Sequence, residues 1–319
     1  MKIVVLERHS AGTDIEMDYS DLGEVTYYPN TVTKEEVAER VQDADIVVAN
    51  KSPLCEETLR SADKLKLICE LATGFDNCDL EYCRKRGIQV RNVVDYSTAM
   101  VAQHTLALAL SLIGKLPFYD RYVKSGAYGD QGRFSNFDLP FYELDGKVWG
   151  IAGLGNIGKR VAGIAKAFGC KVLFYSTSGN STCTEYERVS LDTLLEKSDV
   201  LSLHCPLTEK TRYLIDEAAL MKMKKEAILI NVARGAVVDG QALYKALTEG
   251  WIAAAGLDVL EQEPIIKTNP LGQIKDSSKL IITPHLAWAS VEARTRCVQE
   301  VRKNIEAFLR GEMRNVVNP

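Results

Sequence analysis

Residues 148–158 read VWGIAGLGNIG, an apolar run that leads directly into the pattern Gly-x-Gly-x-x-Gly. The run predicts a buried strand over Val148–Ala152, and the apolar spacing after it predicts a helix through Phe168 that Gly169 closes. A dinucleotide-binding loop requires this context, because glycines let a pyrophosphate approach the amides at a helix N-terminus. We therefore expect dinucleotide binding by the loop residues Gly153, Gly155, Asn156, Ile157 and Gly158.

Five further strand candidates follow this loop, and helical stretches separate them. They are Lys171–Tyr175, Val200–His204, Ala227–Val232, Ala253–Val259 and Leu280–Thr283. Together with the strand before the loop they make six, the number in a dinucleotide-binding fold of the Rossmann type. The stretch Tyr119–Leu144, rich in Gly, Asp and aromatic residues, has weak periodicity and is expected to be a loop.

Residues 1–95 alternate strands and helices in the same way, which predicts a second parallel sheet covered on both faces. Strands are expected at Ile3–Leu6, Val25–Tyr28, Ile46–Ala49, Leu65–Cys69 and Gln89–Asn92, and helices at Lys34–Gln42, Cys55–Ala62 and Leu80–Gly87. A last helix is expected after Ser290, which has the side chain of an N-cap, and before Gly311.

These patterns predict an α/β fold class with two doubly wound parallel-sheet domains. A Rossmann-type dinucleotide-binding domain, residues 99–286, is expected to be inserted into a flavodoxin-like domain of residues 1–98 and 287–319. The insertion follows because the last helix is free to pack back on the first domain. The length of 319 residues agrees with about two domains.

Composition argues against several classes of protein. Apolar residues make up 46% and charged residues 26% of the chain, and the net charge is −4, so we expect no nucleic-acid or membrane partner. The most membrane-like stretch, Thr98–Phe118, contains Gln103, His104 and Lys115 and predicts a buried helix. The eight cysteines lack the two-residue spacing of zinc or redox motifs, so we expect no metal and the reduced thiols of a cytoplasmic protein.

The position expected to bind the adenosine ribose departs from the usual pattern. An acidic residue normally stands about 20 residues after the glycines, at the end of the next strand. Ser176 occupies that place, and the run Ser176–Asn180 contains no Asp or Glu. No Arg or Lys replaces the acid nearby, so the choice of cofactor is open, with NAD favoured and NADP possible.

Three charged side chains follow the last three strand candidates: Arg234, Glu263 and His285. Ligands of open α/β sheets bind at the carboxyl ends of the strands, so an Arg, a Glu and a His placed there predict one catalytic site. The other histidines are weaker candidates. His9 is expected to face solvent, His104 to be a hydrogen-bonded and partly buried group, and His204 has no carboxylate in its local sequence.

Together these motifs resemble the D-isomer-specific 2-hydroxyacid dehydrogenase family. The matching elements are the Gly153–Gly158 loop, Asn231–Gly235, Asp258–Pro264 and Pro284-His285, in the family's order and spacing. The resemblance covers essentially the whole chain and implies NAD(P)-dependent, reversible reduction of a 2-oxo acid to the D-2-hydroxy acid. It also implies a homodimer, with the helix near 98–118 and the loop after it at the interface.

The resemblance implies roles for the residues that meet the substrate. Arg234 would bind the carboxylate and polarise the 2-oxo group, and His285 would give a proton to the oxygen as hydride arrives. Glu263 would orient the imidazole and favour its charged form. The domain of residues 1–98 and 287–319 would be the substrate domain, and its N–H groups at Ala72, Thr73 and Gly74 would bind the carboxylate.

The resemblance also implies how the cofactor is held. Asp258 would hold the nicotinamide carboxamide. The cofactor cleft would be lined by Cys205, Pro206, Val232 and Ala233, with Ser176 beside the ribose.

Two departures look most like the glycerate dehydrogenase/hydroxypyruvate reductase branch of the family: Gln103 before His104, and Ala287-Trp288 after His285. We therefore expect hydroxypyruvate or glyoxylate as substrate, in a small pocket that Phe75, Met100 and Trp288 narrow. The alternatives are a D-lactate or hydroxyisocaproate-type dehydrogenase with a larger pocket, a formate dehydrogenase-like activity, which Glu263 opposes, and a non-catalytic, nicotinamide-sensing corepressor.

Overall fold

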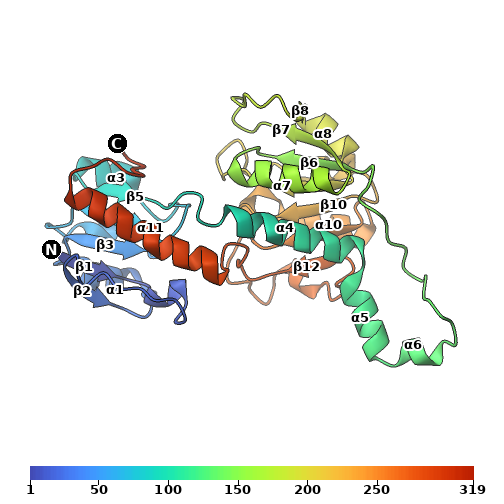
Figure 1. The fold of residues 1–319 in the computed structure, drawn as a ribbon, viewed down its shortest axis with the longest axis horizontal. Helices are drawn as coiled ribbons and strands as arrows, with labels where there is room; N and C mark the ends of the chain where they lie inside the picture. Colours follow the sequence, from blue (N-terminus) through green and yellow to red (C-terminus); the bar gives the residue numbers. More distant parts are fainter. The chain divides into compact units, whose positions relative to one another are not determined.

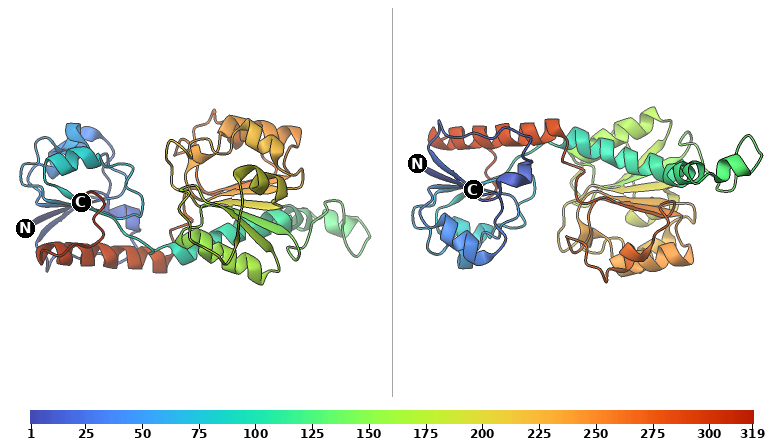
Figure 2. Two further views of the ribbon diagram at one scale, coloured as in Figure 1. Left: turned by 90° about the horizontal axis from the view of Figure 1, so that it is seen from above. Right: turned by 90° about the horizontal axis from the view of Figure 1, so that it is seen from below.

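Two all-parallel β-sheets, of five and seven strands, lie at the centre of the two units of this computed structural model, which describes residues 1–319. The first unit comprises Met1–Ser97 and Ala289–Pro319, and the second comprises Thr98–Trp288. Helices cover both faces of each sheet (Figures 1 and 2). The predicted α/β fold class with two doubly wound parallel sheets is confirmed.

The five strands of the first unit have the spatial order β2-β1-β3-β4-β5. Their bounds are β1 Lys2–Val5, β2 Glu24–Tyr27, β3 Ile46–Ala49, β4 Leu67–Glu70 and β5 Gln89–Arg91. Strands β3 and β4 are buried along their whole length, as apolar runs of a sheet covered on both faces should be. A short 3-10 helix, Arg8–Ala11, follows β1 and leaves His9 exposed.

Helices α1 (Lys34–Val41), α2 (Glu56–Leu59) and α3 (Leu80–Lys85) cover one face of this sheet, and α11 (Val291–Leu309) covers the other (Figure 2). The Ser290 side chain accepts a hydrogen bond from the N–H of Ala293, so Ser290 is the predicted N-cap of α11. Helix α11 is held to the unit by polar contacts as well. The Tyr19 hydroxyl donates to the carbonyl of Val298, and the Asn304 amide donates to the carbonyl of Asn92.

The seven strands of the second unit have the spatial order β12-β11-β10-β9-β6-β7-β8. Their bounds are β6 Val148–Ala152, β7 Lys171–Tyr175, β8 Glu187–Arg188, β9 Val200–Leu203, β10 Ile228–Asn231, β11 Ala254–Leu257 and β12 Leu280–Ile282. The six predicted strands are present. Strand β8 was not predicted, because two exposed residues at a sheet edge carry no hydrophobic pattern.

Two separate apolar clusters pack on the two faces of this sheet. Helices α4 (Thr98–Ile113) and α7 (Asn156–Ala167) cover one face, and α8 (Leu191–Lys197), α9 (Glu217–Lys222) and α10 (Gly240–Glu249) cover the other (Figure 2). No single helix is long and apolar enough to cross a membrane. Helix α4 and the next helix, α5 (Leu116–Lys124), reach that length and hydropathy only when they are counted together, and they meet at a bend of 58°.

The expectation of a loop over Tyr119–Leu144 is wrong for its first part. Helix α5 spans Leu116–Lys124, and one further turn, α6, spans Ala127–Asp130. Lys115 has a φ of +52°, which ends the apolar helix α4, and Pro117 lies in the first turn of α5, where a missing N–H costs nothing. We call residues 116–143 the arm. In Figure 1 the arm extends away from the seven-stranded sheet.

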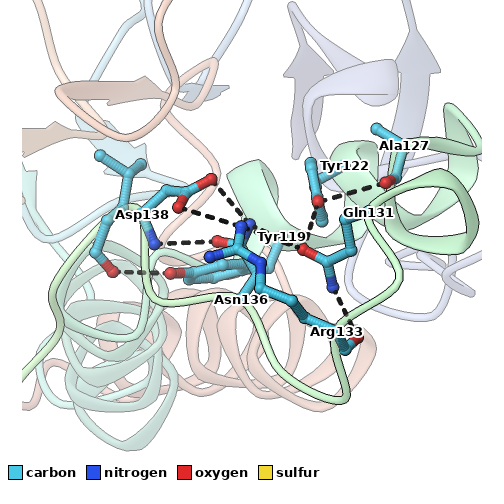
Figure 3. A network of polar contacts seen from close by, with 8 residues as sticks. Tyr119, Tyr122, Ala127, Gln131, Arg133, Asn136 and Asp138 are labelled. Atoms are coloured by element: carbon cyan, nitrogen blue, oxygen red, sulfur yellow. Dashed lines mark hydrogen bonds and ion pairs between the residues drawn. The ribbon is translucent and has the colours of Figure 1, made fainter.

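A network of polar contacts holds the arm together (Figure 3). The Tyr122 hydroxyl lies 2.7 Å from Oε1 of Gln131, and the Gln131 side-chain amide donates to the carbonyl of Arg133. The Tyr119 hydroxyl donates to the carbonyl of Leu139 at 2.6 Å. These contacts close the segment on itself and leave several large apolar side chains exposed, namely Leu116, Val123, Phe134, Phe137, Phe141 and Tyr142.

Candidate active site

The glycine loop between β6 and α7 has the shape that a pyrophosphate requires. Gly153 has a φ of +93°, and a Cβ added there would lie 2.8 Å from the backbone nitrogen of Cys205. A Cβ on Gly158 would lie 2.3 Å from the carbonyl oxygen of Gly153. Gly155, in contrast, faces open space and is the N-cap of α7. The two outer glycines are thus required by packing, and the middle one leaves room for a phosphate beside the helix N-terminus.

A cavity of about 460 Å³ adjoins this loop, and five of the predicted cofactor residues line it. Gly153, Gly155, Ser176, Cys205 and Pro206 line it. Val232, Ala233 and Asp258 are not among its lining residues, nor are Asn156, Ile157 and Gly158 of the loop.

The run Ser176–Asn180 after β7 contains no Arg or Lys, but a lysine from another element lines the same cavity. Lys159, from the first turns of α7, lines the same cavity as Ser176. No carboxylate lines the cavity, and hydroxyl groups surround the expected ribose position, from Ser176, Thr177, Ser178, Ser181 and Thr182. Lys159 was not predicted to line this cavity, because it lies on the helix before β7 and not in the run after that strand.

His285 and Glu263 form a hydrogen-bonded pair beyond the ends of β12 and β11. Nδ1 of His285 lies 2.6 Å from Oε2 of Glu263. An ionised carboxylate only accepts hydrogen bonds, so Nδ1 carries the proton and donates it. The other oxygen of Glu263 accepts the backbone N–H of Leu260 at 2.8 Å. This arrangement fixes the orientation of the imidazole and leaves Nε2 for other chemistry.

Asp258 holds the segment that carries His285. Its carboxylate is almost fully buried and accepts the hydroxyl of Thr283 at 2.6 Å and the N–H groups of Leu286 and Ala287 at 2.9 and 2.8 Å. Its backbone carbonyl accepts the N–H of His285 at 2.9 Å. His285 itself has a φ of +53°, a conformation that non-glycine residues rarely adopt, and these bonds fix it there. A contact of Asp258 with nicotinamide stays a prediction.

Arg234 follows β10 in a turn that packs directly on the chain after β11. The side chain of Asn231 closes the turn, since it accepts the N–H of Ala233 and donates to the carbonyl of Arg234, both at 3.0 Å. A Cβ on Gly235 would lie 1.9 Å from the carbonyl carbon of Leu260, the residue whose N–H binds Glu263. The turns that carry Arg234 and Glu263 are therefore in direct contact.

The remaining histidines of the second unit each contact a neighbouring hydroxyl through Nε2. Nε2 of His104 lies 3.0 Å from the Thr283 hydroxyl, and because that hydroxyl donates to Asp258, the imidazole donates to it. Burial lowers the pKa of His104. Burial also lowers the pKa of His204, to about 3, and Nε2 of His204 contacts the Ser202 hydroxyl. The predicted hydrogen-bonded role of His104 is confirmed.

The predicted carboxylate-binding turn lies in the first unit, after β4. The carbonyl of Ala72 accepts the N–H of Val93 at 2.9 Å, and the carbonyl of Thr73 accepts the Asn92 side-chain amide at 2.7 Å. The Thr73 hydroxyl donates to the carbonyl of Val93 at 2.7 Å. These bonds fix the turn through its carbonyls and the hydroxyl, and they do not use the N–H groups of Thr73 and Gly74. No group of His, Cys, Asp or Glu is placed to hold a metal ion.

Comparison with known proteins gives matches along the whole chain. Residues 106–287 match the family model described as D-isomer specific 2-hydroxyacid dehydrogenase, NAD binding domain. The chain is 39% identical to a glycerate dehydrogenase of Methylorubrum extorquens, over 99% of this chain and 98% of that protein. It is 39% identical to a hydroxypyruvate reductase of Blautia hydrogenotrophica over 100% of this chain and 100% of that protein. It is also 41% identical to a glyoxylate reductase of Korarchaeum cryptofilum, over 90% of this chain and 86% of that protein.

Two solved structures of similar fold contain a bound cofactor. D-lactate dehydrogenase from Aquifex aeolicus, complexed with NAD and lactic acid, has a TM-score of 0.83 and 31% identity and covers 100% of this chain and 99% of that one. An acyclic imino acid reductase in complex with NADPH and D-Arg has a TM-score of 0.88 and 29% identity, and the match covers 99% of this chain and 100% of that one. Both nicotinamide cofactors thus occur on this fold.

Proposed function

Since the chain belongs to the D-isomer specific 2-hydroxyacid dehydrogenase family and carries its NAD-binding domain, we propose that it reduces a short 2-oxo acid of the hydroxypyruvate or glyoxylate type to the D-2-hydroxy acid, reversibly. The observation that carries this proposal is the pair formed by His285 and Glu263 beside the turn of Arg234. An oriented acid–base and a guanidinium, at the ends of strands in a sheet that also carries a nucleotide loop, are what the reduction of a 2-oxo acid requires.

His285 is proposed to exchange a proton with the substrate oxygen through Nε2. Glu263 accepts the hydrogen bond of Nδ1–H throughout, so the imidazole is neutral after Nε2 has given up its proton and keeps the same tautomer and orientation. When bound, the nicotinamide supplies the hydride for reduction or accepts it in the reverse direction. Asp258 keeps His285 in place through the bonds to the segment that carries it.

Arg234 is proposed to bind the substrate carboxylate and to polarise the 2-oxo group, because a guanidinium fork matches the two oxygens of a carboxylate. The N–H groups of Ala72, Thr73 and Gly74 are proposed to bind the same carboxylate. Trp288 is proposed to line the substrate site. Its indole N–H donates to the carbonyl of His285 at 2.9 Å, so its position depends on the same segment.

The experiment that tests this proposal is a panel of substrates with the purified protein. Glyoxylate, hydroxypyruvate, pyruvate and branched or aromatic 2-oxo acids are each assayed with NADH and with NADPH by absorbance. We expect the highest kcat/KM with hydroxypyruvate or glyoxylate, a graded loss with pyruvate, and a D-configured product. A branched or aromatic 2-oxo acid that exceeds hydroxypyruvate tenfold would overturn the small-pocket proposal, and no turnover with any of them would overturn the proposed reaction.

We also propose that the chain forms a homodimer through the arm, residues 116–143. Phe134 and Phe137 are 94% and 79% exposed, and a protein rarely leaves such a group of aromatic side chains in water. The double variant Phe134→Ser/Phe137→Ser should shift the mass in sedimentation equilibrium from two chains towards one. A wild-type protein of one-chain mass would contradict this proposal. Residence in the cytoplasm stays a prediction.

A further inference from the structure

The turn that follows β7 lies directly beside the glycine loop of the same unit. Strands β6 and β7 pair in parallel, with Ala152 level with Tyr175. The N–H of Gly153 donates to the carbonyl of Tyr175 at 3.0 Å, so the contact continues past the ends of both strands. Ser176, the next residue, therefore leaves the sheet beside the first glycine of the loop, where a cofactor on this fold has its adenosine ribose.

This turn contains hydrogen-bond donors that the chain itself does not use. The N–H of Gly179 donates to the carbonyl of Ser176 at 3.2 Å and closes the turn, whereas the N–H groups of Thr177 and Ser178 make no backbone hydrogen bond. Ser176 is 7% exposed and lines the cofactor cavity, and its hydroxyl is bonded to no other group of the chain. Polar groups that are nearly buried usually have a partner, so this hydroxyl is suited to bind a ligand.

Two cations lie against the same turn. Lys159 lines the cavity from α7. Arg188, on β8, donates from its guanidinium to the carbonyl of Gly179 at 3.0 Å, and both sequence neighbours of that glycine, Ser178 and Asn180, line the cavity. A guanidinium has five N–H donors, so this contact leaves others for a ligand.

The carboxylates near the turn do not neutralise these cations. The two acids that precede Arg188 in the sequence are paired with lysines, Glu185 with Lys166 at 3.5 Å and Glu187 with Lys171 at 2.8 Å. No Asp or Glu lines the cavity. The acid that usually stands at the end of this strand accepts the ribose 2′-hydroxyl of NAD and would repel a 2′-phosphate. Without it, nothing at this edge opposes the phosphate.

We propose that the turn Ser176–Gly179, together with Lys159 and Arg188, forms a site for the 2′-phosphate of NADPH, so that the protein binds NADPH more tightly than NADH. This inference rests on the proposed function in one respect, since the reaction must use a nicotinamide dinucleotide. Unused hydroxyl and N–H donors beside two cations match a phosphate better than a ribose hydroxyl, because hydrogen bonds to charged oxygens are roughly twice as strong as those to neutral ones.

The experiment measures binding without any 2-oxo acid. Fluorescence titration gives the dissociation constants of NADPH and NADH, and calorimetry gives those of adenosine 2′,5′-bisphosphate and adenosine 3′,5′-bisphosphate, which carry the same charge. We expect NADPH to bind about tenfold or more tightly than NADH, and the 2′,5′ isomer to bind more tightly than the 3′,5′ isomer by a similar factor. Arg188→Gln and Ser176→Ala should each reduce the preference for NADPH about threefold or more, and Arg188→Lys should retain part of it.

The matched control is Arg160→Gln, which removes an exposed cation that follows Lys159 on the same helix but does not line the cavity, and it should leave the preference unchanged. Equal dissociation constants of NADPH and NADH would overturn the inference and leave the proposed function in place. Equal affinity for the two bisphosphates, or a preference that neither Arg188→Gln nor Ser176→Ala reduces, would also overturn the assigned site. A wild-type protein that binds neither NADPH nor NADH would overturn the proposed function itself. Thermal unfolding, expected to be unchanged, shows that the variants are folded.

Discussion

Oε2 of Glu263 lies 2.6 Å from Nδ1 of His285, although 22 residues separate the two in the sequence. The carboxylate is held in turn by the N–H of Leu260, and the His285 segment by the carboxylate of Asp258. Both members of the pair are thus anchored by the backbone of their own sheet edge, independently of each other. An acid–base that is oriented before the substrate binds has little reorganisation left to make during the reaction.

The first prediction concerns the proton exchange. His285→Ala should lower kcat by at least ~10²-fold, the usual contribution of a positioned acid–base, and should leave the dissociation constant of the cofactor nearly unchanged. Single-turnover kinetics and cofactor titration by fluorescence measure the two effects separately. Near-native turnover in this variant would remove His285 from the reaction.

The second prediction concerns recognition of the carboxylate. Arg234→Lys keeps the positive charge but loses the two-pronged geometry of the guanidinium, so KM should rise strongly and kcat should fall as well. Steady-state kinetics with the best 2-oxo acid checks this. If KM stays at the wild-type value, Arg234 does not bind the carboxylate.

The third prediction concerns the choice of cofactor. Ser176→Asp should favour NADH over NADPH, because a carboxylate accepts from the ribose 2′-hydroxyl and repels a 2′-phosphate. Lys159→Gln should weaken NADPH more than NADH, since Lys159 is the one cation that lines the cavity. Dissociation constants for both cofactors, measured without substrate, give the ratio directly. A ratio that does not move in either variant would show that neither residue is beside the ribose.

The fourth prediction contrasts two glycines of the loop. Gly158→Ala places a Cβ against the carbonyl of Gly153 and should destabilise the second unit by about 1–3 kcal/mol, the usual cost of overpacking. Gly155→Ala meets open space, so it should leave stability nearly unchanged but weaken cofactor binding. Urea unfolding and cofactor titration on both variants test the contrast. Equal stability of the two variants would contradict the described loop.

The fifth prediction concerns acid stability. The folded pKa of His204 is about 3 and the unfolded value about 6.5, so the unfolded state takes up a proton first as the pH falls. The free energy of unfolding therefore decreases below pH ~6.5, and His204 alone accounts for a decrease of roughly 2 kcal/mol at pH 5. His204→Gln lacks this contribution, and its free energy of unfolding should fall less between pH 7 and pH 5. A drop equal to that of the wild type would contradict the burial of a neutral His204.

Secondary-structure elements whose pattern lies within one stretch of the sequence were predicted well. The strand, glycine loop and helix at 148–169 were predicted from apolar spacing and from glycines that stand between a strand and a helix. The helices α5 and α6 of the arm were missed, because α5 has only nine residues and neither helix has a buried residue. Helix α5 does have amphipathic spacing, but its nine residues are fewer than the window of about 11 residues over which periodicity identifies a helix.

The residues of the candidate site were predicted from the sequence, but the hydrogen bonds that hold them in place were not. Arg234, Glu263 and His285 follow neighbouring strands β10, β11 and β12, so their clustering follows from the parallel topology. The three bonds that the Asp258 carboxylate accepts from the His285 segment and the place of Lys159 on the cofactor cavity depend on packing between separate elements. No pattern in a single stretch of sequence contains that information.

The distribution of tryptophan gives the two units different optical properties. Trp149, Trp251 and Trp288 all lie in the second unit, and Trp149 is fully buried, with its indole N–H on the Ser202 hydroxyl. Intrinsic tryptophan emission therefore reports on the second unit alone, while far-ultraviolet circular dichroism reports on both. Where the two signals change at different denaturant concentrations, the difference gives the separate stability of the first unit, without any engineered label.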